Sequence, residues 1–299
     1  MVPRRSAWLW KAAGYDEVLR LGDAVVLVEE SVTGARAVLR YVPMRVLANR
    51  KRYPELRTQL TRLAEVSDPR VLPFQDFVTD PRLARPDLHV GTGYGGALVY
   101  EAVAGADLRR LLQRNTPLAP EAALVVAKDA RLGLAAAHRH GVRPNVLAPH
   151  RMIATDEGRI LLTGLALGTI EEPDFLYRAP ELWRHEPDSM AADCYSLGCV
   201  LFECLTGRSP FRRSALFSLM SAHTTAARPL EVLPVPLRPL LAEALAKEPP
   251  RDLSPTKIDA LAKATYGPDW ESRGRRALAE RAAPFIQPFP PPAPRPPMP

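Results

Sequence analysis

Cysteine is scarce in this chain, and long apolar runs are missing. The three cysteines, Cys194, Cys199 and Cys204, stand in one apolar stretch; their spacing fits no metal motif, and an odd number cannot complete a disulfide framework. Buried, reduced thiols are therefore expected, which suits a reducing compartment. No stretch reaches the roughly 18 apolar residues of a membrane span, and Lys11 arrives before a signal-peptide core develops. The sequence predicts a cytoplasmic protein without a membrane span.

Acidic residues are outnumbered by basic ones, and proline is abundant. The chain has 33 Asp and Glu against 40 Lys and Arg, a formal net charge of +7, and 32 prolines in 299 residues. A positive charge favours encounters with anionic partners such as phosphorylated protein, nucleic acid or a membrane surface. The abundance of Arg, Ala and Pro also has a simpler explanation, which is the base composition of the genome.

Short strands dominate the first hundred residues, and helices dominate the rest. Strands are expected at 24–29, 37–42, 71–78 and 97–101, with a helix that begins at Pro54. Later helices are expected at 107–113, 120–140, 193–205, 236–247 and 254–264, with a small hairpin at 152–162. The helix at 193–205 is almost entirely apolar, so it should lie at the centre of its lobe.

This order of elements indicates a two-lobe α+β fold. The expected parts are an N-terminal extension (1–14), a strand-rich lobe (15–103), a helical lobe (104–266), a basic helix (267–283) and a proline-rich tail (284–299). So many prolines in the last part predict an extended, polyproline-like conformation or a disordered end.

Two consecutive motifs in the helical part resemble protein kinases. Tyr177-Arg178-Ala179-Pro180-Glu181 resembles the A-P-E end of an activation segment, and residues 193–207 resemble the central helix of bacterial Ser/Thr protein kinases. The resemblance covers residues 15–265, roughly, and implies a bilobal protein-kinase-like fold with a β-rich N-lobe and a helical C-lobe. It also implies that Glu181 forms a structural ion pair with Arg251, and that Asp193 belongs to the same scaffold.

The resemblance fails at the positions that perform catalysis. In the loop 143–150, Asn145 stands in place of the catalytic aspartate, Leu147 in place of the following lysine, and His150 in place of the metal-binding asparagine. Thr163 stands where D-F-G begins. An amide cannot accept a proton at neutral pH, and loss of a general base alone lowers the rate by roughly 10²–10⁴-fold. Because Thr163 carries no charge to hold Mg²⁺, we expect neither phosphate transfer nor a bound metal.

The nucleotide-binding positions are altered as well. Arg40 replaces the strand lysine, and Gln59 replaces its helix glutamate, although Glu55 lies one turn earlier and is a candidate partner for Arg40. In the family, the backbone of Glu101 and Val103 would contact adenine.

The glycine-rich loop is reduced to a single glycine, Gly22. As a nucleotide-binding loop it would be closed or altered, because Asp23 would repel phosphate and Val25 and Val26 would crowd a nucleotide. The favoured interpretation is a plain β-hairpin strand. We expect no cofactor, and ATP binding is not favoured.

The favoured function is that of a pseudokinase, a signalling scaffold without enzymatic activity that binds protein partners. An atypical Ser/Thr kinase and a nucleotide-binding switch without phosphate transfer remain open. Thr169 is a candidate phosphorylation site, so the partner could be a kinase or a phosphothreonine-binding domain. The tail and the basic helix are candidate contact elements, unless the helix packs back on the C-lobe. Nucleic acid is not favoured, because no aromatic residues interleave with the arginines of that helix.

Overall fold

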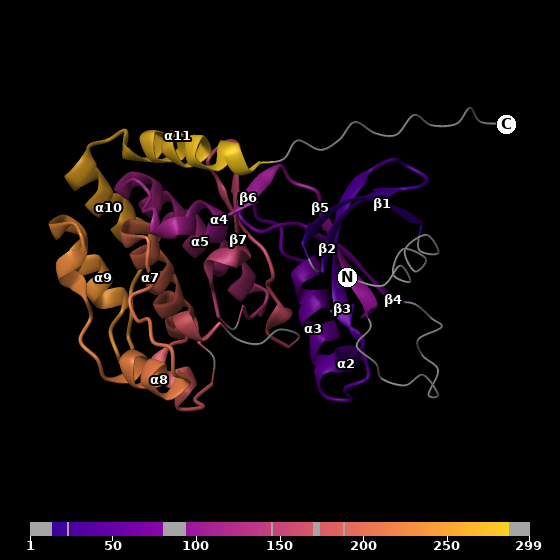
Figure 1. Ribbon diagram of the computed structural model, residues 1–299, viewed down its shortest axis with the longest axis horizontal. Coiled ribbons are helices and arrows are strands. Elements are labelled where there is room, and N and C mark those ends of the chain that lie inside the picture. The colour runs from indigo at the N-terminus through magenta and orange to yellow at the C-terminus, as the bar shows by residue number, and fades with distance from the viewer. Residues whose placement is uncertain are drawn as a thin grey trace. The chain divides into compact units, whose positions relative to one another are not determined.

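The computed structural model describes residues 14–22, 24–79, 94–144, 146–169, 174–187 and 189–286. These residues form two compact units (Figure 1), the first made of 14–64 and 72–104 and the second of 65–71 and 105–286. Strands predominate in the first unit and helices in the second, so the fold is α+β as expected. Asn145 and Asp23 lie outside the described residues, as do most of the N-terminal extension and of the proline-rich tail.

The first unit is built on an antiparallel sheet. Its strands are β1 (Tyr15–Gly22), β2 (Val25–Glu30), β3 (Arg36–Pro43), β4 (Phe74–Thr79) and β5 (Tyr94–Glu101), in the order β1-β2-β3-β5-β4. Because neighbouring residues of a strand face opposite sides, Val26 is buried in the core of the sheet while Val25 is only half-buried. Strands β1 and β2 pair antiparallel, in agreement with the plain β-hairpin favoured from the sequence, and of the two valines it is Val25 that lies opposite Arg40 of β3.

Two helices accompany this sheet, α2 (Met44–Leu47) and α3 (Arg52–Ala64). The longer one begins two residues before the expected start at Pro54. The side-chain oxygen of Asn49 accepts hydrogen bonds from the amides of Lys51 and Arg52, at 3.0 and 2.9 Å, and so satisfies donors that a helix start leaves unpaired. The buried face of α3 carries the apolar residues that sequence spacing placed together, Leu56, Leu60 and Leu63.

The second unit surrounds two long helices, α5 (Pro120–Arg139) and α7 (Met190–Thr206). Helix α7 is buried on almost every side, as its apolar sequence predicted. It begins before residue 193 because the Ser189 side chain accepts a hydrogen bond from the Ala192 amide at 3.2 Å. The three cysteines all lie on α7, buried and not in disulfides.

Shorter elements complete the second unit. A small antiparallel sheet contains β6 (Gly105–Asp107), β7 (Met152–Thr155) and β8 (Ile160–Leu162). The other helices are α4 (Leu108–Leu111), α6 (Pro180–Trp183), α8 (Leu216–Thr224), α9 (Arg238–Ala244), α10 (Pro255–Tyr266) and α11 (Trp270–Ala282). None of the helices in the described part of the chain is both long and apolar enough to span a membrane.

The strand expected at 71–78 is divided between the two units. Strand β4 begins only at Phe74 and pairs with β5 in the first unit. Val71 instead makes an isolated parallel bridge with Leu162 in the second unit, and the Arg70 carbonyl accepts a hydrogen bond from the Leu162 amide at 2.7 Å. One run of apolar residues thus contributes to a sheet in each of the two units, and its periodicity does not show where it divides.

Candidate functional site

The scaffold of the second unit contains a buried ion pair between Glu181 and Arg251. Arg251 donates through Nη1 and Nη2 to the two carboxylate oxygens, at 2.6 and 3.0 Å. The Arg251 side chain is 0% exposed and that of Glu181 is 3% exposed. The other guanidinium hydrogen bonds go to backbone carbonyls of residues 191, 246 and 247. With every partner in place, the pair connects the start of α6 to the loop before α10.

A second buried pair joins the end of α5 to the start of α7. His138 Nε2 lies 2.6 Å from Asp193 Oδ2, and Asp193 is almost completely buried. Burial raises the pKa of the Asp193 carboxyl, and the neighbouring His138 opposes that rise. A pocket of about 260 Å³ lies beside the pair, smaller than the roughly 300–1,000 Å³ typical of ligand sites. Asp193 therefore serves as a link between two helices.

The loop before β7 is fixed by a buried arginine, Arg151. Its Nη1 donates to the carbonyl oxygens of Pro144 and Gly164, both at 3.1 Å, while its own carbonyl accepts from the Thr163 amide at 2.9 Å. Arg151 is only 3% exposed, and Leu147 beside it in the loop is fully buried. A guanidinium thus connects the loop before β7 to the segment after β8.

His150 points to a different set of partners. Arg109 Nη2 lies 2.9 Å from His150 Nδ1 and donates to Asp174 Oδ2 at 2.7 Å. Because arginine only donates hydrogen bonds, Nδ1 of His150 must be the acceptor. That nitrogen is consequently engaged and is not available as a proton acceptor or metal ligand.

Side chains of residues 174–183 contact helices α4 and α7. The Tyr177 hydroxyl donates to Glu203 Oε2 at 2.5 Å, and burial raises the pKa of both groups. The Phe175 and Trp183 rings stack with centroids 5.3 Å apart. Asp174, at the start of this segment, pairs with Arg109. Glu171 and Glu172 lie outside the described residues, and so does the side chain of Thr169.

The nucleotide-binding candidates of the first unit are distributed over β3, α3 and the end of β5. Arg40 is half-buried on β3, on the face opposite the buried Leu39. Glu55 is exposed in the first turn of α3 and Gln59 is half-buried one turn later. The pairing of Arg40 with Glu55 stays a prediction.

The two residues expected to contact adenine lie at the end of β5 and just beyond it. Glu101 is exposed and its amide donates to the Pro73 carbonyl at 3.0 Å, while Val103 beyond it is half-buried. As for metals, no group of three or more His, Cys, Asp or Glu side chains is arranged to hold an ion in the described residues.

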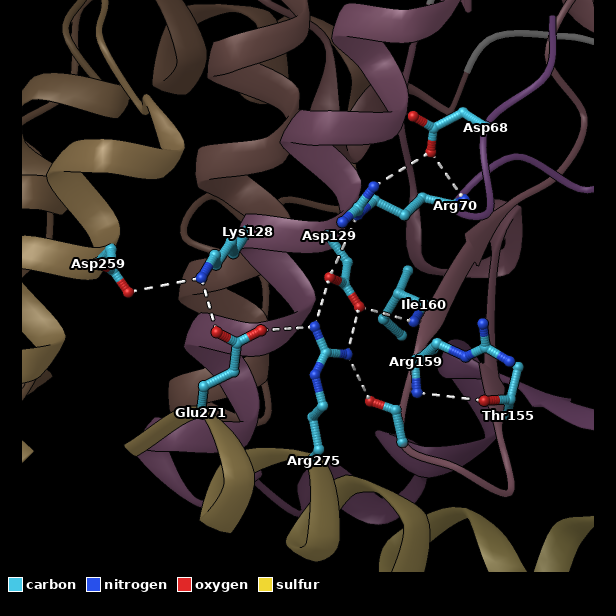
Figure 2. A network of polar contacts seen from close by, with 11 residues as sticks. Asp68, Arg70, Lys128, Asp129, Thr155, Arg159, Ile160, Asp259, Glu271 and Arg275 are labelled. Carbon is cyan, nitrogen blue, oxygen red and sulfur yellow. Dashed lines mark hydrogen bonds and ion pairs between the residues drawn. The ribbon is translucent and has the colours of Figure 1, made fainter. Parts of the chain in front are cut away.

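The basic helix of the sequence, α11, packs along α5. Figure 2 shows Arg275 donating to both carboxylate oxygens of the buried Asp129, at 2.9 Å each. Asp129 also accepts from the Ile160 amide at 3.1 Å, and Arg70 Nε lies 3.6 Å from it. Lys128, the neighbour of Asp129, donates to Glu271 at 2.7 Å. These contacts join α11, α5 and β8.

Two other arginines of α11 are also bound within the unit. Arg273 pairs with Glu121 at 2.8 Å, and Arg281 donates to the Leu111 carbonyl at 2.7 Å. Close packing requires Gly274, because a Cβ there would come within 2.6 Å of the Glu121 carbonyl oxygen. Of the two alternatives left open by the sequence, packing against the helical unit describes α11, while Arg276 remains exposed.

These features define a two-unit α+β protein with an A-P-E segment anchored by a buried Glu-Arg pair. The family model described as "Protein kinase domain" matches residues 24–263. The chain belongs to the protein kinase family, which confirms the predicted fold.

Its relatives include actinobacterial kinases. The chain is 29% identical over 264 residues to serine/threonine-protein kinase PknE of Mycobacterium bovis, a match covering 80% of this chain and 44% of PknE. It is 32% identical over 222 residues to serine/threonine-protein kinase PkaB of Streptomyces coelicolor, which covers 67% of this chain and 50% of PkaB. The chain thus spans about half the length of the curated relatives it matches.

Sequence reasoning missed the residues that organise the second unit. Arg151 precedes an apolar strand with nothing to show that its charge is buried, and Asp129 stands between Lys128 and Arg131, as an exposed acid of a helix would. The burial of Asp129 could have been inferred from one signal: helical spacing places this acid on the same face of α5 as apolar residues. Its partner Arg275 is 146 residues away in sequence, so no local pattern could have paired them.

Proposed function

We propose that this protein is a pseudokinase: a member of the kinase family that does not transfer phosphate and acts by binding protein partners. The observation that carries the proposal is the buried Arg151 between the carbonyl oxygens of Pro144 and Gly164. A kinase needs carboxylate and amide oxygens between its catalytic loop and the segment after β8, because they hold the metal ions that neutralise the phosphates. This chain offers a cation there.

The position of Arg151 also bears on how the catalytic motif is aligned. In H-R-D-L-x-x-x-N the metal-binding asparagine follows the catalytic aspartate by five residues. Arg151 faces the segment after β8 and His150 does not, which favours Arg151 at the asparagine position. Val146 then replaces the aspartate, one residue after Asn145. By the same argument, Gly164 takes the D-F-G position assigned to Thr163.

Both alignments lead to the same chemistry. Val146 and Asn145 equally lack a carboxylate to accept the proton of an attacking hydroxyl. Mg²⁺ prefers carboxylate and other hard oxygen ligands, and neither Thr163 nor Gly164 has a carboxylate. The positive charge of the Arg151 guanidinium would repel a metal ion placed beside the Gly164 carbonyl oxygen. The residues present therefore do not fit Mg²⁺.

Thermal unfolding with ATP, with Mg²⁺ and with both tests the proposal, alongside a phosphate-transfer assay with labelled ATP. A ligand at about 100 times its Kd adds roughly 2.7 kcal/mol to the free energy of unfolding, a shift on the order of 5 °C for a domain of this size. We expect no shift that depends on Mg²⁺ and no labelled product. A Mg²⁺-dependent shift together with transfer of label would establish an atypical kinase instead.

A second candidate is a nucleotide-binding switch that works without metal. The observation in its favour is that β3 keeps a positive charge, Arg40, on the face opposite the core. A nucleotide bound there would shift the unfolding midpoint with ATP alone, and Arg40→Ala would remove the shift while Arg276→Ala would not.

Phosphorylation of Thr169 by another kinase would supply one route to a partner. This proposal rests on the position of Thr169 in the activation-like segment. Mass spectrometry of the protein isolated from its own cells tests it, since a consistently unmodified Thr169 would leave it without support.

A further inference from the structure

The stretch that leads into α8 exposes large apolar side chains that take no part in the packing of the fold. All residues from 212 to 218 are exposed, including Phe217 at 76% and Leu216 at 54%. Helix α8 already has a buried face made of Leu219, Ala222 and His223, so Phe217 is not needed in its packing. An aromatic side chain so exposed, next to a second apolar one, is typical of a contact surface.

Two arginines stand beside these apolar residues. Arg212 and Arg213 are exposed, and the side-chain hydrogen bond seen for the pair runs from Arg213 Nη1 to the Arg212 carbonyl at 2.8 Å. Neither arginine forms an ion pair with a residue in the described part of the chain. By contrast, three arginines of α11 are engaged with acids or carbonyls. The charge of Arg212 is felt by the Glu203 carboxylate, whose pKa it lowers against the effect of burial, but both guanidinium groups stay exposed beside the apolar surface.

We propose that the α8 patch, defined as Arg212, Arg213, Leu216 and Phe217, binds a protein segment that presents carboxylates beside an apolar side chain. The inference rests on the partner-binding role proposed above and identifies a surface for it. The apolar pair would provide the buried anchor, and the arginines would select acidic segments and speed their association. Such an attraction between charges weakens as salt is added.

Fluorescence anisotropy with the full chain and defined peptides tests this. The probes are a pool of 12-residue peptides with a central Leu or Phe flanked by Asp and Glu, the same pool with Ala at the centre, and the same pool with Lys for the acids. We expect binding of the first pool alone, weakened at least tenfold by Phe217→Ser and by Arg212→Glu with Arg213→Glu. Val32→Ser and Arg276→Glu, which change an exposed valine and arginine elsewhere, should leave binding unchanged.

Several outcomes would overturn the proposal. They are no binding by the first pool, equal binding by the Ala pool, or equal weakening by Arg276→Glu, which would mean attraction by net charge only. Self-association abolished by Phe217→Ser would make the patch a contact between two copies of this chain, and binding to anionic vesicles but not to peptides would make it a membrane contact. None of these results depends on ATP, so they stay separable from failure of the pseudokinase proposal. Unchanged unfolding midpoints verify that the variants fold.

Discussion

Arg275 on α11 and Asp129 on α5 form a two-bond ion pair, with Nη1 and Nη2 each 2.9 Å from a carboxylate oxygen. Asp129 is almost completely buried, and the pairing raises the pKa of the Arg275 guanidinium. The pair closes the network of Figure 2 and fixes the last helix to the rest of its unit.

Replacement of one partner should strongly destabilise the second unit. Arg275→Met leaves the Asp129 carboxylate buried without its main counter-charge, so we expect the free energy of unfolding in urea to fall by about 3–5 kcal/mol. Arg276→Met, one residue along on the exposed side, should change it by less than about 0.5 kcal/mol. Equal effects of the two substitutions would contradict the assigned role.

The Glu181–Arg251 pair should behave similarly. Arg251→Met leaves a carboxylate that is 3% exposed without its partner, and about 3–5 kcal/mol of stability should be lost. The matched control is Arg184→Ala, which removes an exposed ion pair with Glu248 and should cost less than about 1 kcal/mol. Urea unfolding monitored by tryptophan fluorescence measures both, and a small loss for Arg251→Met would show that the pair is dispensable.

Arg151→Met should loosen the loop before β7. It removes the donor that satisfies the carbonyls of Pro144 and Gly164, and each buried group left without a partner costs about 1–3 kcal/mol. We expect a loss of about 2–4 kcal/mol and faster hydrogen exchange at the Thr163 amide. Arg139→Met, at an exposed position of α5, serves as the control. Unchanged exchange at Thr163 in the Arg151 variant would argue against this role.

Stability should fall in mild acid because of His223. This residue is fully buried with Tyr195 Oη 3.0 Å from its Nδ1, and burial, reinforced by Lys247, lowers its pKa to about 3. The unfolded chain binds the proton near the ordinary pKa of about 6.5. The stabilising contribution is therefore fully present above pH 6.5 and is lost as the pH falls toward 3.

The expected loss between pH 7 and pH 5 is about 2 kcal/mol. His223→Gln should remove this part of the pH dependence, whatever its effect on stability at pH 7. His140→Gln, which changes a histidine that is only half-buried, should preserve it. Urea unfolding at a series of pH values measures the slope, and an unchanged slope in the His223 variant would refute the assignment.

Much of the fold follows from local sequence. The apolar run of α7 and the helical spacing of Leu56, Leu60 and Leu63 indicate buried faces, because side-chain burial is a periodic property of helices. The A-P-E motif also led to the Glu181–Arg251 contact, through resemblance to a family. Starts of helices were less predictable, since side-chain caps such as Asn49 and Ser189 lie one to three residues before the first helical residue and outside the periodic pattern.

The site was less predictable than the fold. A charged side chain is normally exposed, so sequence alone gives no reason to bury Arg151, and a shift of one residue in the motif changes which side chain faces the segment after β8. The packing of α11 was also hidden, because its arginines resemble a solvated basic surface until Asp129 and Glu121 are found opposite them.

The last helix has a practical consequence for where the domain can be cut. The family match ends at residue 263, but the charge that neutralises Asp129 is carried by Arg275, and the fully buried Trp270 belongs to the same helix. A chain that ends at residue 263 would lack α11. Apolar surface along α5 would then be exposed to solvent, and the Asp129 carboxylate would lose its counter-charge. The part of this protein that folds as one unit therefore extends beyond residue 263, where the family match ends.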